Sequence, residues 1–376
     1  MKILLTFGTR PEAIKLAPIY HILKSQPNRF ETLVCVTGQH REMLDQALDI
    51  FKIKSDIDLD VMSENQSLCK LASKILTRLE PQLEKIQPDV LLVHGDTTTS
   101  VAAALAGFYK GIKIAHIEAG LRTNNLYSPF PEEFNRQAIS RIASWHFAPT
   151  ERSRENLIRE NILEKNIFVT GNTVIDSLYY SLRVIEQNES LKKKIAKNLN
   201  EKLNFLWASE KFILITGHRR ESFGDGFREI CFSIKRLAKK YPCFRFVYTL
   251  HLNPNVRKIV VDNLKDQKNI YLINPLDYQS FIYLIKKCYL VLTDSGGIQE
   301  EAPSLCKPVL VMRNQTERPE GIEAGTLKLV GTQSKNIISN TSALIDDQKL
   351  YDSMAGSKNP YGDGKASKRI VKILGK

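Results

Sequence analysis

Two short apolar runs in the first third of the chain constrain its fold most, because each ends at a carboxylate. Residues 90–93 run into Asp96, and residues 112–117 run into Glu118. Apolar runs of this length, bounded by glycine and acidic residues, are typical of buried parallel strands. The alanine-rich segment 98–110 between them has the apolar spacing of a helix. The stretch therefore predicts a strand–helix–strand unit within a parallel sheet.

Three acids are expected to meet at one edge of this sheet. Ligands of parallel α/β sheets bind beyond the carboxyl ends of the strands, where Asp96 and Glu118 would both lie. Glu132 supplies the third acid and follows Pro131, a residue that suits the first turn of a helix. Carboxylates gathered in this way indicate acid–base chemistry. Their mutual repulsion is expected to raise the pKa of at least one of them toward neutrality.

Each acid also has a purely structural interpretation. Asp96 could cap the helix that follows it. Glu118 could pair with Arg122 in a loop, and Glu132 could interact with the dipole of its own helix. The position of all three acids at strand ends favours a site over three separate structural roles.

The composition is that of a globular protein with two domains. The chain has 376 residues, of which 43% are hydrophobic and 25% charged, and this length suffices for two ordinary domains. No apolar run approaches the length of a membrane span. Residues 1–11 are expected to contain a first strand rather than a signal peptide. The six cysteines are scattered without a CxxC pair, which favours reduced thiols and a cytoplasmic location.

The net charge of +13 raises the question of nucleic-acid binding. However, the lysines fall mostly on predicted helices, as in 192–197 and 235–240, and no nucleic-acid-binding signature occurs. A lysine-rich solvated surface accounts for the charge, and a smaller anionic ligand is compatible with it. Neither a nucleic-acid partner nor a membrane partner is expected.

The β-α pattern repeats along the whole chain, so each half is expected to be a doubly wound parallel sheet of the Rossmann type. A polar, lysine-rich segment at 187–204 marks the region between the halves. Two such α/β domains are expected to face a central cleft that holds the ligand. The predicted strands are residues 3–7, 33–37, 90–93, 112–117, 145–148, 167–169, 212–216, 245–249, 270–273, 290–293, 309–311 and 328–330.

The turn after the first strand suits an anion. Gly8 leaves backbone N–H groups free at the start of a helix, and Arg10 and Lys15 lie nearby in sequence. The turn is not the GxGxxG fingerprint, so no nicotinamide cofactor is indicated. The alternative is a plain strand–helix turn with two surface bases.

A second glycine turn follows residues 290–293 in the other half. Ser295, Gly296 and Gly297 stand at the start of a helix, where exposed N–H groups would cradle a diphosphate. Glu301, one turn further, could accept two hydrogen bonds from a ribose diol. The turn lacks the Gly-Lys-Ser/Thr of a nucleoside-triphosphatase loop, so ATP hydrolysis is not expected.

Two histidines follow strands of the second half. His218 comes directly after a glycine at the end of the strand 212–216 and could act as a proton donor or a phosphate ligand. The alternative is a histidine whose ring is satisfied by a backbone carbonyl. His251, which follows the strand 245–249, is a further candidate ligand.

A series of motifs runs through the chain in a fixed order: FGTRPEAIKLAP, LVHGDTTT, HIEAGLRT, SPFPEEFNR, TGNTVIDSL, TGHRRESFG, HLNPNV, TDSGGIQEEAP, VMRNQTERPE and NPYGDGKAS. Together they resemble the non-hydrolysing UDP-N-acetylglucosamine 2-epimerases of bacteria, over nearly the whole chain. The resemblance implies a fold like that of GT-B glycosyltransferases, with a last helix at about 365–374 that crosses back onto the first domain. The implied domains are residues 1–170 with 362–376, and residues 171–361.

The resemblance also implies an activity, the reversible conversion of UDP-GlcNAc into UDP-ManNAc for surface polysaccharide synthesis, with no cofactor and no metal. It implies a UDP-sugar partner and a homodimer. In the implied site, the loop at 295–297 holds the diphosphate, Glu301 the ribose, and backbone near Phe281 the uracil. The implied catalytic residues are Asp96, Glu118, Glu132 and His218. The implied substrate-binding residues are Arg10, Lys15, Phe281, Ser295, Gly296, Gly297 and Glu301.

Many bacterial members of this family also bind UDP-GlcNAc as an activator beside the catalytic site. The residues that match this region are Gln39, Gln66, Glu133, Arg219 and His251. The chain departs from some activator-dependent members at Glu42 and Asn65, where those members carry Gln and Arg.

The chemistry of the sugar agrees with this set of groups. C2–H is not adjacent to a carbonyl, so a carboxylate cannot remove its proton directly. If UDP departs first, C2–H becomes acidic, and elimination gives 2-acetamidoglucal. Alternatives are a modified UDP-sugar as substrate, a hydrolysing epimerase, a glycosyltransferase of the same fold, and a silent nucleotide-sugar-binding regulator. The three acids argue against a silent regulator, because binding UDP needs none of them.

Overall fold

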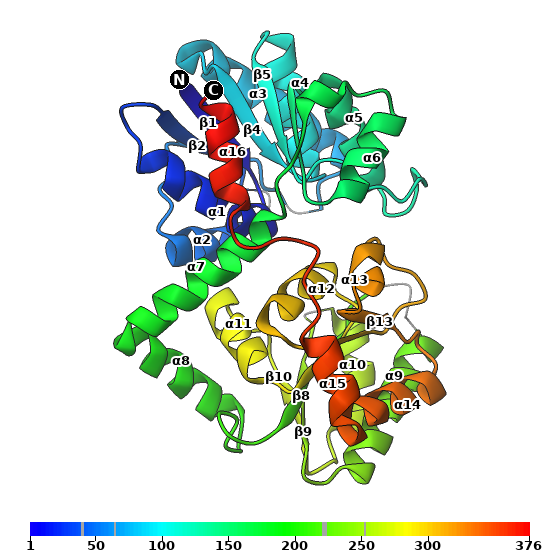
Figure 1. Cartoon of the computed structure of the whole chain (residues 1–376). Helices are drawn as coiled ribbons and strands as arrows, with labels where there is room; N and C mark the ends of the chain where they lie inside the picture. The colour runs from blue at the N-terminus through cyan, green and yellow to red at the C-terminus, as the bar shows by residue number, and fades with distance from the viewer. Residues whose placement is uncertain (39–40, 64, 220–223, 252) are drawn as a thin grey trace. The chain divides into compact units, whose positions relative to one another are not determined.

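The chain forms two α/β units, each built on one parallel sheet. The computed structural model describes residues 1–38, 41–63, 65–219, 224–251 and 253–376. Unit 1 comprises Met1–Tyr180 and Tyr361–Lys376, and unit 2 comprises Ser181–Pro360 (Figure 1). Residues 171–180 therefore group with unit 1, whereas the boundary expected from the sequence lies at 170/171.

The strand order in the sheet of unit 1 reverses at one point. The order is β3-β2-β1-β4-β5-β6-β7, and every pairing is parallel. The order reverses between β1 and β4, the position at which doubly wound sheets bind their ligands. The strands are β1 (Lys2–Phe7), β2 (Glu31–Val36), β3 (Ile57–Asp58), β4 (Val90–His94), β5 (Lys113–Ile117), β6 (Trp145–Ala148) and β7 (Ile167–Val169).

Helices cover both faces of this sheet, because right-handed crossovers on the two sides of the reversal lead to opposite faces. Helix α1 packs against α2 and α16, whereas α4 packs against α3 and α5. Strand β4 is accordingly buried along its whole length, as its unbroken apolar run predicts. The helices are α1 (Arg10–Lys24), α2 (Arg41–Phe51), α3 (Leu68–Ile86), α4 (Thr98–Tyr109), α5 (Glu132–Ile142), α6 (Glu151–Arg159) and α16 (Ala366–Leu374). Helix α7 (Thr173–Gln187) begins in unit 1 and ends in unit 2.

The C-terminal helix α16 belongs to unit 1 and lies beside α1 (Figure 1). Asp176 accepts hydrogen bonds from the backbone N–H groups of Ala366 and Ser367, at 3.2 and 2.8 Å, and so holds the first turn of α16. At the other end of the helix, Arg29 donates to the carbonyl of Gly375 at 3.0 Å. Contacts between residues far apart in sequence therefore attach the end of the chain to its beginning.

The sheet of unit 2 repeats the same design with the order β10-β9-β8-β11-β12-β13, again entirely parallel. Its order reverses between β8 and β11. The strands are β8 (Phe212–Thr216), β9 (Arg245–Thr249), β10 (Ile270–Ile273), β11 (Leu290–Thr293), β12 (Val309–Val311) and β13 (Leu327–Leu329). The helices are α8 (Glu189–Lys202), α9 (Asp225–Lys240), α10 (Pro254–Leu264), α11 (Tyr278–Lys287), α12 (Gly296–Glu301), α13 (Pro319–Glu323), α14 (Ser334–Asp346) and α15 (Gln348–Ala355).

The prediction of two doubly wound α/β sheets is confirmed. Every strand predicted from the sequence is present, with ends that differ by at most two residues. The sequence did not predict β3, because two residues are too few to show a pattern. The lysine-rich segment 187–204 contains α8, which buries Ile195 and Leu199 on one side and turns its lysines to solvent.

Strand β5 buries a histidine that does not belong to the candidate site. The ring of His116 is fully buried, and its Nε2 lies 2.7 Å from the carbonyl oxygen of Gly95. Burial, opposed in part by this hydrogen bond, lowers the pKa of His116 from 6.5 to about 3. The unfolded chain therefore binds a proton at this ring before the folded protein does.

We expect this histidine to make unit 1 less stable in acid. Its contribution is complete above pH 6.5 and is lost as the pH falls from 6.5 toward 3, by about 1.4 kcal/mol per pH unit. His116→Gln, which can still donate to the Gly95 carbonyl, should unfold with a shallower pH dependence. Urea unfolding between pH 7 and 5 in a Trp207→Phe background would test this, because Trp145 then reports unit 1 alone. Equal pH slopes for the two proteins would contradict the prediction.

Candidate active site

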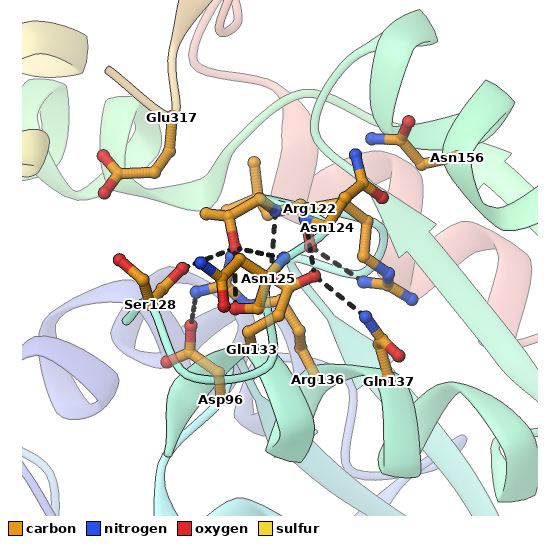
Figure 2. A network of polar contacts seen from close by, with 12 residues as sticks. Asp96, Arg122, Asn124, Asn125, Ser128, Glu133, Arg136, Gln137, Asn156 and Glu317 are labelled. Carbon is orange, nitrogen blue, oxygen red and sulfur yellow. Dashed lines mark hydrogen bonds and ion pairs between the residues drawn. The ribbon is translucent and has the colours of Figure 1, made fainter. Parts of the chain in front are cut away.

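Asp96 follows β4 at the reversal of strand order in unit 1 and is held by α5. Its Oδ2 lies 2.5 Å from a guanidinium nitrogen of Arg136 (Figure 2). Its backbone carbonyl accepts from the side chain of Asn135 at 2.8 Å. Asp96 does not cap the next helix: Thr97 does so, by accepting from the backbone N–H of Ser100 at 3.0 Å. The capping interpretation of Asp96 is therefore wrong, and its partly exposed carboxylate is left at the strand end.

Glu118 follows β5, the next strand, and is bound by three groups from other elements. Its Oε2 pairs with the ammonium of Lys15, accepts from Asn172 at 2.8 Å, and lies 3.6 Å from Nε2 of His94. Its φ of 62° is in the left-handed region, which costs a residue with a side chain about 1–3 kcal/mol. The expected alternative partner, Arg122, instead makes a two-pronged pair with Glu160.

The pKa of Glu118 depends more on Lys15 and His94 than on the other acids. Burial alone raises its pKa, but the charges of Lys15 and His94 and their hydrogen bonds hold the pKa of Glu118 well below 4.5. The expected rise in pKa through mutual repulsion of the acids therefore does not occur at Glu118. Asp96 and Glu118 each pair with a cation of their own at the same edge of the sheet.

Glu132 and Glu133 open α5, after two cis peptide bonds at Pro129 and Pro131. One carboxylate oxygen of Glu132, Oε2, is buried without a hydrogen-bond partner among the described residues. Glu133 is fully buried and receives hydrogen bonds from the loop at 123–124 and from Gln137, at 2.9 to 3.1 Å (Figure 2). Glu133 thus ties the loop before α5 to the helix, while Glu132 keeps an unused acceptor.

The sequence predicts free N–H groups for an anion in the turn after β1, and this prediction is wrong for Gly8 and Thr9, because Glu12 accepts from both. Glu12 also ties this turn to the turn after β4. The carboxylate of Glu12, which is 2% exposed, accepts from the backbone N–H groups of Gly8 and Thr9 at 3.1 and 2.8 Å. Its other oxygen accepts from the hydroxyls of Thr97 and Ser100 at 2.7 and 2.9 Å. Both turns beside the reversal of strand order therefore share one buried carboxylate.

Arg10 and Lys15 both lie on α1, the helix that begins at this turn. Arg10 is its first residue, and Lys15 reaches Glu118 one turn later. Unit 1 therefore brings Arg10, Lys15, Asp96, Glu118 and Glu132 onto elements that begin or end at the carboxyl edge of its sheet.

In unit 2, His218 is held by Asp294 across the reversal between β8 and β11. Its Nδ1 lies 3.0 Å from Oδ1 of Asp294, and its ring stacks on that of His251 with centroids 5.2 Å apart. Asp294 is fully buried, and its Oδ2 accepts from the backbone N–H groups of His218 and Arg219 at 2.7 and 2.8 Å. The alternative interpretation, a ring satisfied by a backbone carbonyl, is not what the structure shows.

The predicted diphosphate loop starts α12, with Ser295 as the N-cap and Gly296 and Gly297 as the first helical residues. A Cβ placed on Gly296 would lie 2.6 Å from a guanidinium nitrogen of Arg318. The Arg318 side chain is held there by Glu300, whose Oε1 accepts from its Nε at 2.6 Å. The loop therefore combines helix N–H groups with an adjacent cation, which is the composition of an anion site.

The predicted ribose and base contacts lie on α11 and α12. Glu301 ends α12, and its Oε1 accepts from the hydroxyl of Tyr278 at 2.9 Å. This hydrogen bond from a buried tyrosine orients the carboxylate. Phe281 lies on α11 and is partly buried; its backbone N–H donates to the carbonyl of Asp277.

The residues expected to bind an activator fall in both units. Gln66 precedes α3 and has a buried Oε1 without a partner in the described part of the chain, and Glu133 holds the loop before α5. Arg219 follows His218, and His251 stacks on it. Gln39 lies outside the described residues.

Sequence reasoning missed several residues that the structure connects to the site. They are Glu12, Arg136, Asn172, Asp294 and Arg318. Only Glu12 leaves a local signal, because Thr9 and Glu12 have the spacing of a capping box. The others act on residues 20 or more positions away, and a single sequence does not show such contacts.

Two kinds of feature are absent from the described ranges. No group of three or more His, Cys, Asp or Glu side chains is placed to hold a metal ion. No helix there has the length and apolar character needed to cross a membrane.

Comparison with known proteins gives one consistent result. The family model for UDP-N-acetylglucosamine 2-epimerase matches residues 22–375. The UDP-N-acetylglucosamine 2-epimerase of Yersinia pestis is 54% identical over 374 residues, which cover 100% of this chain and 98% of the relative.

Two solved structures are similar over the whole chain. One is the UDP-GlcNAc 2-epimerase from Neisseria meningitidis bound to UDP-GlcNAc, with a TM-score of 0.92 and 53% identity, covering 100% of this chain and 99% of the other. Another is the UDP-GlcNAc 2-epimerase from Methanocaldococcus jannaschii in complex with UDP-GlcNAc and UDP, with a TM-score of 0.83, 34% identity and the same coverage. With a matching family model and relatives of this identity over its full length, the chain belongs to the UDP-N-acetylglucosamine 2-epimerase family.

Proposed function

We propose that this protein catalyses the reversible epimerisation of UDP-GlcNAc to UDP-ManNAc at C2 of the sugar. The observation that carries the proposal is the pair of carboxylates, Asp96 and Glu118, at the ends of neighbouring strands β4 and β5, each beside its own cation. A protein that only bound UDP would need neither acid. The similar structures named above contain UDP-GlcNAc or UDP, which supports the choice of nucleotide sugar.

The reaction proceeds by elimination and re-addition of UDP. The C1–O bond to the diphosphate breaks with the electron pair leaving on UDP, and C1 gains positive character. A carboxylate then removes the proton from C2, and the electrons of the C2–H bond form the C1–C2 double bond of 2-acetamidoglucal. In the return step, UDP re-adds at C1 while C2 receives a proton on the opposite face. No electrons enter or leave, so the cycle needs no redox partner.

Unit 2 supplies the groups for the departing UDP. The N–H groups at Gly296 and Gly297, the hydroxyl of Ser295 and the guanidinium of Arg318 stabilise the negative charge that develops on the diphosphate. The backbone N–H of Ser295 itself donates to the hydroxyl of Thr293 at 2.9 Å. Glu301, oriented by Tyr278, binds the ribose diol. Backbone near Phe281 binds the uracil.

Unit 1 supplies the proton transfers. Glu118 takes the role of base, because its low pKa keeps it in the ionised form, which is the form that can accept a proton. When Glu118 accepts the proton from C2, Lys15 keeps its positive charge, and this charge favours the later release of the proton from the carboxylate. Asp96 and Glu132 complete the acid–base set, and Arg10 contributes positive charge at the start of α1.

Several features remain predictions for this chain. They are a homodimer, a second UDP-GlcNAc bound as activator by Gln39, Gln66, Glu133, Arg219 and His251, and a role in surface polysaccharide synthesis. A cytoplasmic location is supported by the six cysteines, all of which are free thiols.

Incubation with UDP-GlcNAc in deuterated water, followed by NMR of the sugar, tests the proposal. Deuterium should enter C2 of UDP-ManNAc, because the proton removed from one face exchanges before C2 is protonated on the other. Release of free ManNAc with UDP would show a hydrolysing enzyme instead. Transfer of the sugar to an added acceptor would show a glycosyltransferase, and binding without turnover would show a regulator.

A further inference from the structure

Each unit carries a buried carboxylate at the reversal of its strand order, and neither belongs to the residues assigned to catalysis or binding above. In unit 1, Glu12 joins the turn after β1 to the turn after β4. In unit 2, Asp294 joins the end of β11 to the turn after β8. The turn after β8 carries His218, so the carboxylate of unit 2 contacts a group of the proposed site directly.

The two oxygens of Asp294 have separate partners. Oδ2 accepts from two backbone N–H groups, those of His218 and Arg219, at 2.7 and 2.8 Å. Oδ1 is buried without a hydrogen bond among the described residues, and the nitrogen it approaches is Nδ1 of the His218 ring, at 3.0 Å. Asp294 is fully buried, whereas the His218 side chain is 36% exposed, so one end of the contact is fixed and the other reaches solvent. His251 stacks on the ring with an interplanar angle of 18°.

We propose that Asp294 is a positioning residue that sets the orientation and the tautomer of His218 for the epimerisation. The proposal rests on the function proposed above, in which His218 acts at the phosphates and the sugar. An ionised carboxylate can only accept, so the hydrogen of the neutral ring must sit on Nδ1. Nε2 is then the ring nitrogen left for the substrate: it accepts a proton when the ring is neutral and donates one to the departing diphosphate when the ring is charged.

The charges around the ring agree with this assignment. Burial alone raises the pKa of Asp294, but the close approach and charge of His218, with the two backbone N–H groups, lower its pKa overall. Asp294 is therefore ionised when it faces the ring. The other titratable ring in contact is His251, whose pKa is lowered by burial and by the charge of His218, so it tends to be neutral.

The variant Asp294→Asn distinguishes a role of Asp294 in positioning His218 from a purely structural role. An amide has one oxygen, and the two backbone N–H groups keep that oxygen at the Oδ2 position. The NH2 group then faces Nδ1 of His218 and can only donate, so the ring hydrogen must move to Nε2. We expect kcat to fall by about a hundred- to ten-thousandfold, with a smaller change in UDP affinity.

The tautomer is read from the ¹⁵N shifts of histidine-labelled protein, at a pH where the ring is neutral, with His218→Gln to assign the signals. Wild-type protein should carry the hydrogen on Nδ1, and the Asp294→Asn variant on Nε2. Asp176→Asn is the matched control, because Asp176 also accepts from two backbone N–H groups, those of Ala366 and Ser367, at the start of α16. The control should lose thermal stability and leave the His218 tautomer unchanged.

Three results would overturn the proposal: a wild-type ring with its hydrogen on Nε2, an Asp294→Asn variant with the wild-type tautomer, or a changed tautomer without a loss in kcat. If the Asp294→Asn variant does not fold, the tautomer of His218 in the wild-type protein alone tests the proposal. If wild-type protein shows no epimerisation, the proposed function fails, while the ¹⁵N experiment still shows whether Asp294 sets the ring.

Discussion

Glu118→Gln is expected to lower kcat for epimerisation by about a hundred- to ten-thousandfold, because glutamine cannot accept the proton from C2. Asp96→Asn should act in the same direction. UDP affinity should change little in either variant, since the groups proposed to bind the diphosphate lie in unit 2. Epimer formation is measured by NMR, and UDP binding by calorimetry. If re-addition suffers more than elimination, 2-acetamidoglucal and UDP should accumulate in solution.

Glu118→Gln also removes the carboxylate from its ion pair with Lys15, in which the two side chains are 12% and 8% exposed. Removing one member of a buried ion pair costs about 3–5 kcal/mol, so the variant should also unfold more readily. The double variant Lys15→Met, Glu118→Gln removes both charges and should recover stability without recovering activity. Wild-type kcat in Glu118→Gln would exclude this carboxylate as the base. Recovery of activity in the double variant would show that the single variant had failed only through instability.

Gly296→Val is expected to weaken UDP binding by about ten- to a hundredfold or more, the equivalent of one or two charged hydrogen bonds. A Cβ at this position would lie 2.6 Å from the Arg318 guanidinium, so the side chain must displace that cation. The two added methyl groups would also keep a phosphate away from the N–H groups of α12. Calorimetric titration with UDP measures the loss.

Gly297→Ala is the matched control for a purely steric effect on the free protein. The nearest atom to a Cβ at Gly297 is Oε2 of Glu301, at 4.0 Å, so alanine fits without moving a neighbour. Any loss of UDP affinity in Gly297→Ala must therefore come from the ligand itself. Unchanged UDP affinity in both variants would remove this loop from the nucleotide site.

The elements of both sheets could be predicted because their signals are local. A buried parallel strand needs an unbroken apolar run, and β4 and β5 show such runs, each followed by an acid. The ends of those strands also locate Asp96 and Glu118, since parallel strands bring their carboxyl ends to one edge. The candidate acids Asp96 and Glu118 were thus predicted from strand ends together with the motifs of the family.

The partners of these acids could not be predicted in the same way. Glu118 and Arg122 are close in sequence, yet Glu118 pairs with Lys15 and Arg122 with Glu160. The predicted rise in an acid's pKa failed at Glu118 for this reason: the prediction counted the neighbouring carboxylates but not the cation that α1 brings to them. A pKa depends on all charges within a few ångströms, whatever their separation along the chain.

The sequence by itself determined the secondary structure, the parallel sheets and the strand ends at which Asp96, Glu118 and the loop at Ser295 stand, because apolar runs and glycine turns act over a few residues. The tertiary structure decided which groups hold them: Lys15 at Glu118, Arg318 at Gly296, and Asp294 at His218. These contacts depend on strand order and register, which join segments from 22 to more than 100 residues apart.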